Sequence, residues 1–262
     1  MRLLIIQVGP HRIENFSLNQ FKSLNNVFSN IDCARIMWKS DASLKSRNVS
    51  IIDDEGVDES INFVIDAEIE QPTNNSLKHV GCNEYIKWSR NAKESNFFVT
   101  ATQFIYTRHL LQIAKSINQY DYVMKIRPDV IFFKKEIMFD KIEQIIALNN
   151  NNLYAAKNPH CHPTKQVSDH FFLGKFNIFD KIWPHNLSYS VLFNLSKYNP
   201  ERLLRLRSIL SRVKVDVVCE RYVDYWNFDS KPRSYDPPVF QNVASKSMSL
   251  PCEILEYISK YA

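Results

Sequence analysis

YVMKIRPD, residues 122–129, is the segment most informative about the fold, because a short apolar run ends here in two charged residues. It follows residues 99–118, in which apolar side chains recur at helical spacing along one face. A buried strand that directly follows an amphipathic helix is typical of α/β proteins with a parallel sheet. We therefore expect residues 122–126 to form a central strand whose carboxyl end carries Arg127 and Asp129.

The rest of the chain continues this alternation of strands and helices. Residues 2–8 predict a buried first strand, and residues 16–29 and 34–38 add a helix and a second strand. This spacing predicts a βαβ unit and an α/β, Rossmann-like fold, with a mostly parallel central sheet flanked by helices. Further strands are expected at 61–66, 129–133, 153–156 and 214–219, and further helices at 137–148, 176–195 and 199–212.

Composition narrows the class of protein. Glycine is scarce, with 4 residues in 262, and neither a dinucleotide-binding fingerprint nor a P-loop is present. Five widely spaced cysteines favour a reducing compartment, and the net charge of +5 suits an anionic substrate or surface. No signal peptide or membrane span is recognisable, so a cytoplasmic location is expected, with peripheral contact at the inner membrane as a further option.

No internal repeat or linker divides the sequence. We therefore expect residues 1–262 to form a single domain, because this length suits one α/β unit. Residues 220–262 are rich in proline and are expected to form an extended tail that packs on the domain.

The carboxyl end of the predicted central strand is the first candidate site. In open α/β sheets, ligands bind at the carboxyl ends of the strands. Arg127 and Asp129 are two residues apart, so they point the same way in extended chain, and Lys125 precedes them. An arginine fork suits phosphate, while an aspartate suits a divalent cation or sugar hydroxyls. The alternative is that Arg127 and Asp129 form an ion pair that closes the strand end.

The end of the predicted first strand is a second candidate. Gly9 is followed by Pro10, His11 and Arg12, and a helix is expected to begin shortly after. A cation in such a turn, next to a helix N-terminus, can hold a nucleotide phosphate. The alternative is a solvated turn.

Three further residues have side chains suited to proton transfer. Asp169 and His170 adjoin one another before an apolar segment, and they suit contact with acceptor hydroxyls or the role of a base. The alternative for Asp169 is a helix N-cap, and Glu201 is explained by the helix start at Asn199 and Pro200. The stretch His160-Cys161-His162 lacks the partner spacing of a zinc site and is interpreted as a loop.

Four segments in this order resemble bacterial surface-polysaccharide glycosyltransferases of the WavE-like type and related GT-A-like enzymes with an R-x-D motif. They are residues 9–12 after the first strand, 120–129 with the R-x-D motif, 168–174 and 199–204. The resemblance covers most of residues 1–220 and is most specific at 120–129.

The resemblance implies a GT-A-like fold, a nucleotide-sugar donor and a glycan or lipid-linked glycan acceptor. It places Arg127 and Asp129 at the donor phosphates and metal. The strand-end candidates Gly9, His11, Arg12 and Lys125 are then expected to bind the donor as well. The resemblance places Asp169 near the acceptor, with His170 and Glu201 as the other candidates for the catalytic base. Asp129 is the one motif carboxylate that suits a Mn²⁺ or Mg²⁺ cofactor, because the chain contains no D-x-D triplet.

The leading hypothesis is thus a glycosyltransferase for capsule, lipopolysaccharide or related glycans, in which Asp129→Asn abolishes transfer while the fold stays intact. The second is a non-catalytic nucleotide- or carbohydrate-binding protein of the same fold. RNA-binding signatures are absent, so no nucleic-acid partner is expected. A third hypothesis keeps lipid or nucleic acid as a ligand of the stripe Arg202, Arg205 and Arg212.

Overall fold

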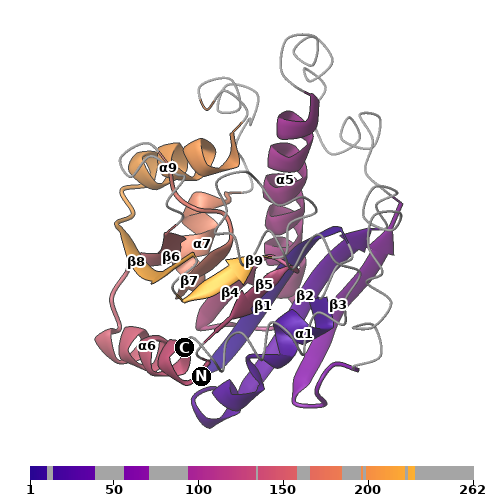
Figure 1. Ribbon diagram of the computed structural model, residues 1–262, viewed down its shortest axis with the longest axis vertical. Coiled ribbons are helices and arrows are strands. Elements are labelled where there is room, and N and C mark those ends of the chain that lie inside the picture. The colour runs from indigo at the N-terminus through magenta and orange to yellow at the C-terminus, as the bar shows by residue number, and fades with distance from the viewer. Residues whose placement is uncertain are drawn as a thin grey trace.

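The computed structural model describes residues 1–10, 14–38, 56–70, 94–133, 135–157, 166–184, 196, 199–221 and 224–227. Its centre is a seven-stranded sheet in the order β3-β2-β1-β4-β7-β6-β8 (Figure 1). The strands are β1 (Arg2–Pro10), β2 (Asn30–Trp38), β3 (Ile61–Ile69), β4 (Tyr122–Ile126), β6 (Leu153–Lys157), β7 (Phe171–Lys175) and β8 (Val215–Glu220). Only β7 is antiparallel to its neighbours, so the sheet is mixed but mostly parallel.

Helices cover both faces of this sheet. The helices α5 (Glu94–Ile117), α7 (Phe176–Ile182) and α9 (Pro200–Leu210) pack on the face that carries Leu4 and Ile6. The helices α1 (Glu14–Asn19) and α6 (Lys135–Leu148), with the 3-10 helix η1 (Lys22–Asn26), pack on the face that carries Leu3 and Ile5. This arrangement confirms the predicted α/β fold with a mostly parallel sheet flanked by helices.

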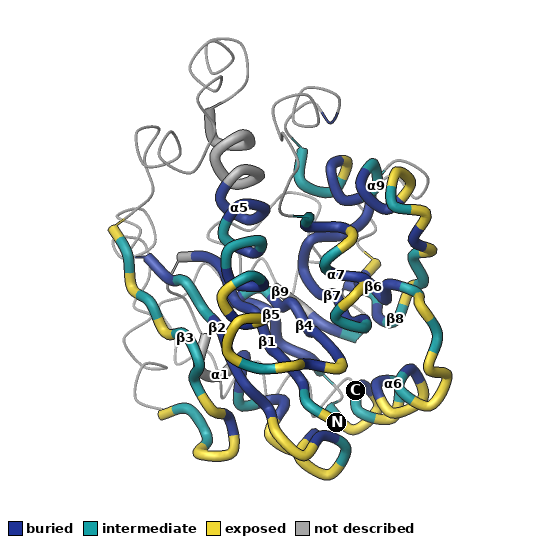
Figure 2. The backbone as a smooth tube through the Cα atoms, turned by 180° about the vertical axis from the view of Figure 1, so that it is seen from behind, coloured by how far each residue is buried: buried dark blue, intermediate teal, exposed yellow. Residues whose placement is uncertain are grey.

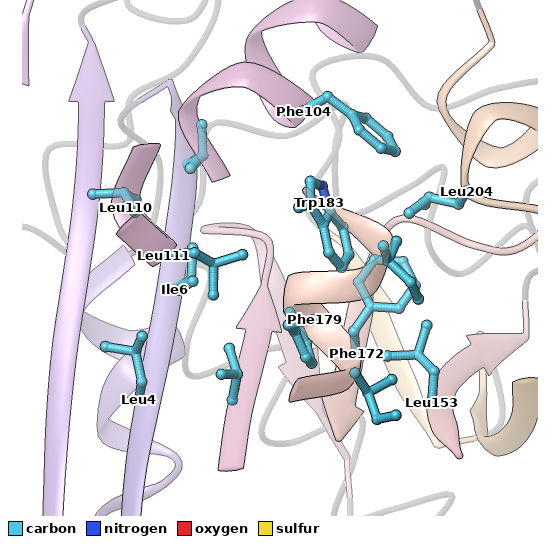
Figure 3. Packing of buried hydrophobic residues seen from close by; sticks show 14 of the residues in the cluster. Leu4, Ile6, Phe104, Leu110, Leu111, Leu153, Phe172, Phe179, Trp183 and Leu204 are labelled. Atoms are coloured by element: carbon cyan, nitrogen blue, oxygen red, sulfur yellow. The ribbon is translucent and has the colours of Figure 1, made fainter. Parts of the chain in front are cut away.

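The core on the α5 side is built around Trp183. Its ring stacks on Phe179 at 5.1 Å and lies 5.6 Å from Phe104 of α5 (Figure 3). Phe172 of β7 approaches the same indole edge-on at 5.9 Å. Such aromatic contacts add to the stabilisation that burial provides, so Trp183 ties α5 and α7 to the sheet.

Burial is deepest in the middle of the sheet. Figure 2 shows β1 and β4 in the dark blue of buried residues, whereas β3 at the edge alternates between half-buried and exposed. No helix in the described part of the chain is long and apolar enough to cross a membrane.

The single helix predicted at residues 16–29 is wrong in its extent, because the chain forms α1 and then η1 instead. Gln20 lies at the break between them, and its buried side chain binds the strand β5 (Val130–Phe132). Its amide nitrogen donates to the carbonyl oxygen of Val130 at 3.0 Å, and its amide oxygen accepts from the backbone N–H of Phe132 at 2.7 Å. These two hydrogen bonds hold the Gln20 side chain against β5, and the chain leaves the helical conformation at this point.

Two other segments differ from expectation. Residues 130–132 do not continue the main sheet; they pair with β9 (Tyr225–Asn227) in a separate two-stranded sheet. Residues 171–175, expected to lead into a helix, are the antiparallel strand β7, and the helix that follows ends at Ile182. Residues 185–195 of that predicted helix, and 228–262 of the predicted tail, lie outside the described residues.

A buried aspartate joins the amino ends of the central strands. Asp32, 2% exposed, accepts hydrogen bonds from Asn62 at 3.1 Å, Asn118 at 3.1 Å and the Tyr120 hydroxyl at 2.9 Å. Arg2 of β1 lies 3.6 Å from the same carboxylate. The cluster lies at the opposite end of the strands from the carboxyl ends where ligands bind, so we interpret it as structural.

We expect Asp32→Ala to lower the free energy of unfolding by about 2–3 kcal/mol, because buried donors lose their acceptor. Urea denaturation of the purified protein measures this loss. The matched control is Asp66→Ala. It removes an exposed carboxylate of β3 that is paired with Arg35 of β2, and it should lower the free energy of unfolding by less than about 1 kcal/mol. Equal losses in the two variants would contradict the structural role of Asp32.

Candidate functional site

The candidate site lies where the strand order of the sheet changes direction. The chain leaves β1 for β2 on one side, while β4 pairs with β1 on the other. In open α/β sheets, this switch point leaves a crevice outside the carboxyl ends of the two strands. Gly9 of β1 meets Pro128 here, since a Cβ at Gly9 would lie 3.1 Å from the proline ring. Gly9 thus gives room for the turn that carries Arg127 and Asp129.

Arg127 and Asp129 form a two-bond ion pair beyond the end of β4. Arg127 Nε and Nη2 donate to the two carboxylate oxygens of Asp129 at 3.0 and 2.9 Å. The aspartate side chain is 1% exposed and the arginine side chain 19%. The alternative that the sequence left open, an ion pair that closes the strand end, is therefore present, and it fixes the direction of the guanidinium.

Asp169 lies on the other side of the same guanidinium. Its carboxylate is 3.9 Å from Arg127 Nη1 and 3.7 Å from His170 Nε2, which is beyond hydrogen-bond distance. Burial alone would raise the pKa of Asp169, but the surrounding positive charge, above all that of Arg127, holds it below its usual value. The site therefore contains a buried, ionised carboxylate that is stabilised by nearby positive charge without a direct hydrogen bond to Arg127 or His170.

Lys125 adds a second, more deeply buried cation. It is 2% exposed, and its ammonium group lies 5.7 Å from the centre of the Phe172 ring. Burial lowers the pKa of Lys125 to about 8, while the charge of Asp169 opposes this shift. The lysine is still mostly charged at neutral pH, so the protein holds a costly buried cation at this point.

Glu201 brings a second carboxyl group to the site from the first turn of α9. Asn199 is the N-cap of this helix, because its side chain accepts a hydrogen bond from the N–H of Arg202 at 2.8 Å, as its sequence pattern indicates. Glu201 Oε2 is buried and has no hydrogen-bond partner among the described residues. Burial, followed by the charge of Asp169, raises the pKa of Glu201 to about 7.

The structure thus brings Asp169 and Glu201 together with their pKa values displaced in opposite directions. Two titratable groups whose environments separate their pKa values are typical of acid–base sites. Helix capping, which explained Glu201 from the sequence alone, accounts for its backbone position. Capping does not explain why one side-chain oxygen of Glu201 is buried without a hydrogen-bond partner among the described residues, or why the charge of Asp169 acts on it.

His170 lies in the same cluster and has a partner that the sequence did not indicate. Its Nδ1 is 2.9 Å from the hydroxyl of Tyr225 in β9, and both residues are buried. Burial, with Arg127 as the next cause, lowers the pKa of His170 to about 3, so the ring is neutral. Tyr225 is 55 residues from His170, and no local pattern predicts that contact.

Other sequence candidates are not part of this cluster as described. His11 and Arg12, and the stretch His160-Cys161-His162, lie outside the described residues. Of the arginine stripe, Arg202 and Arg212 are exposed, and Arg212 has a left-handed backbone with φ of 54° just after α9.

Asp129 does not fit the role of a cation ligand in this conformation. Both of its oxygens accept hydrogen bonds from Arg127, and the residue is fully buried. Across the described ranges, no group of three or more His, Cys, Asp or Glu side chains is arranged to hold a metal ion. We therefore derive no step through a metal.

Comparison of the chain with protein-family models gives no match, and comparison with curated protein sequences gives none either. The cluster itself and the motif resemblance are therefore what indicate a function for this chain.

Proposed function

We propose that the chain is a glycosyltransferase that moves a sugar from a nucleotide-sugar donor to a glycan acceptor in surface-polysaccharide synthesis. The observation that carries this proposal is that the buried cation Lys125 and the half-buried Arg127 lie together with two carboxyl groups of shifted pKa at the switch point of the sheet. The resemblance of four ordered segments to surface-polysaccharide glycosyltransferases supports it.

The cations suit the diphosphate of the donor. Arg127 is the more exposed of the two. Asp129 binds its Nε and Nη2 and so holds the guanidinium in place, which leaves the Nη1 end suited to direct contact with phosphate oxygens. Lys125 is more deeply buried, and its charge stabilises an anion from inside the protein. A bound diphosphate would offset the cost of burying this lysine, and the same charges would stabilise the diphosphate as it leaves.

The carboxyl groups suit the acceptor. In the transfer step, the acceptor oxygen forms a bond to the anomeric carbon of the sugar, and the bond from that carbon to the diphosphate breaks. The electron pair of the broken bond leaves with the diphosphate, and the acceptor hydroxyl loses its proton. Asp169 is ionised and accepts no hydrogen bond in the described part of the chain, so we assign it the role of accepting this proton. Glu201, with a pKa of about 7, is the second group able to exchange a proton at neutral pH.

The experiment that tests this proposal is a thermal-shift screen with UDP, GDP and CMP, each with and without Mn²⁺. A ligand at one hundred times its Kd adds about 2.7 kcal/mol to the stability of the folded state. For a chain of this size we expect one nucleotide to raise Tm by roughly 5–10 °C. Donor hydrolysis and transfer assays with the corresponding sugar nucleotide follow.

Lys125→Met gives this screen its sharpest variant. Because Lys125 is a buried cation with a lowered pKa, replacement by methionine should keep or raise Tm in the absence of ligand. The same variant should lose most of the shift that the nucleotide causes. Lys115→Met, at an exposed lysine paired with Asp180, is the matched control and should keep the full shift.

The outcomes separate the candidate functions. A nucleotide shift that survives Lys125→Met would contradict the assignment of the donor site. Binding without hydrolysis or transfer to any acceptor would favour a non-catalytic nucleotide- or carbohydrate-binding protein. No nucleotide shift in the screen would contradict the proposal.

A further inference from the structure

We propose that Tyr225 is a positioning residue, whose hydroxyl donates a hydrogen bond to His170 Nδ1 and thereby turns the Nε2–H of His170 toward Asp169. The part of this inference that concerns catalysis rests on the proposed function, whereas the direction of the hydrogen bond does not. The inference assigns a role to the strand β9, which no motif in the sequence connects with the site.

The geometry fixes the contact between the two rings. The Tyr225 hydroxyl is 2.9 Å from His170 Nδ1, and the rings meet edge to face with their centres 5.8 Å apart. Tyr225 is fully buried and His170 is 4% exposed. The other ring nitrogen, Nε2, is 3.7 Å from Asp169 Oδ1. The imidazole ring therefore lies between the phenol and the carboxylate.

The charges around the imidazole ring decide how many protons it carries. Arg127, Asp169, Asp129 and Arg221 all act on it, and the two arginines oppose its protonation. Together with burial they keep the ring neutral, so only one of its nitrogens bears a hydrogen atom. The tautomer then depends on the partners of the two nitrogens.

The carboxylate next to Nε2 selects one of the two tautomers. If Nδ1 carried the hydrogen, the lone pair of Nε2 would face the ionised Asp169, and the two would repel each other. If Nε2 carries it, the N–H faces the carboxylate, and Nδ1 accepts from the phenol. Tyr225 keeps its proton for this bond, because burial raises its pKa.

Ser168 lies next to the same pair of rings. Its side chain lowers the pKa of Tyr225 in part, against the larger effect of burial, and its Oγ accepts a hydrogen bond from the backbone N–H of His170 at 3.4 Å. With the phenol donating to Nδ1, the remaining N–H of His170 faces Asp169.

Neighbouring contacts hold Tyr225 in place. The preceding residue, Asp224, accepts a hydrogen bond from Lys141 of α6 at 3.1 Å, and its carbonyl oxygen accepts one from the N–H of Phe133 at 2.9 Å. These contacts do not involve the Tyr225 hydroxyl. Removal of that hydroxyl should therefore break the hydrogen bond to His170 while β9 stays in place.

The test is the ¹⁵N spectrum of the histidine side chains in the full chain, because protonated and bare ring nitrogens have well-separated shifts. The chain has seven histidines, and the signals of His170 are those missing from His170→Gln. We expect the wild-type ring to be neutral and protonated at Nε2. In Tyr225→Phe, the Nδ1 signal should lose the shift caused by its hydrogen bond, and the other tautomer should become visible.

The matched control is Tyr154→Phe, which removes another buried tyrosine hydroxyl, one that accepts a hydrogen bond from Asn150 at 2.7 Å. It should leave the signals of His170 unchanged. In the transfer assay, Tyr225→Phe should lower kcat by about 10–100-fold, by analogy with residues that orient the histidine ligands of metal sites. KM should stay within about twofold, since no substrate contact is removed.

A wild-type ring protonated at Nδ1, or at both nitrogens, would overturn the hydrogen-bond assignment whatever the activity of the protein. Unchanged kcat in Tyr225→Phe, with the tautomer altered, would overturn its role in catalysis. If no donor supports transfer by the wild type, the proposed function fails, and the ¹⁵N spectrum still decides for or against the hydrogen-bond assignment.

Discussion

Asp169→Asn is expected to lower the rate of sugar transfer by about 10²–10⁴-fold, the usual contribution of a positioned acid or base. The side chain keeps its shape, and its amide oxygen can still face the N–H of His170, so the change removes basicity and charge with little loss of volume. Because Asp169 is a buried carboxylate without a hydrogen bond to its oxygens in the described part of the chain, its neutralisation should change Tm by only a few degrees. Transfer kinetics and thermal unfolding of the same preparation measure both effects.

The control for this variant is Asp180→Asn. Asp180 lies in α7, is paired with Lys115 and has a side chain that is 44% exposed. Its replacement should change neither transfer nor stability measurably. If Asp169→Asn kept the wild-type rate, Asp169 would not be the proton acceptor, and Glu201→Gln would be the next variant to assay.

Asp129→Ala is expected to have the largest effect on stability, a loss of about 3–5 kcal/mol, as found when one partner of a buried ion pair is removed. Asp129 is completely buried, and both of its oxygens bind the Arg127 fork. From the sequence alone we expect Asp129→Asn to spare the fold. The depth of burial leads us to predict instead that this variant also loses stability, since an amide supplies only one acceptor to the two arginine donors. Urea denaturation measures the loss.

A double variant separates the stability effect from the functional one. Arg127→Met with Asp129→Leu replaces both partners by apolar groups, which is often neutral for stability. We expect this variant to regain at least half of the stability lost in Asp129→Ala and to remain inactive, because the fork proposed to meet the donor is gone. Recovery of transfer in the double variant would show that Arg127 has no part in donor binding.

Much of the fold was predictable because strong local patterns survive in the structure. The apolar run of β1, the helical spacing within α5 and the apolar run of β4 all appear where they were expected. The N-cap at Asn199 was also correct, since capping depends on neighbours within one turn.

The elements that were missed depend on distant partners. The strand β7 is short, and its first four residues are all buried; such a run has no periodicity that separates a strand from part of a helix. Gln20 interrupts the expected helix because of bonds to residues 110 and 112 positions away.

The candidate site divides in the same way. Lys125, Arg127 and Asp129 were found because they follow one strand, and Asp169 and His170 because they adjoin one another. That Asp129 would hold the arginine rather than face a ligand could not be decided without the depth of burial. Tyr225 could not be found at all, because its contact with His170 joins β9 of the small sheet to the residue just before β7 of the main sheet, 55 positions away.

The late position of β9 in the chain has a consequence for shortened forms of the protein. Every strand of the seven-stranded sheet lies within the first 220 residues, so a chain that stops before Tyr225 would still contain all of them. In such a chain, β5 would lack its partner strand and His170 would lack the phenol at Nδ1. Truncation before Tyr225 would therefore keep the strands of the main sheet and leave the candidate site unfinished.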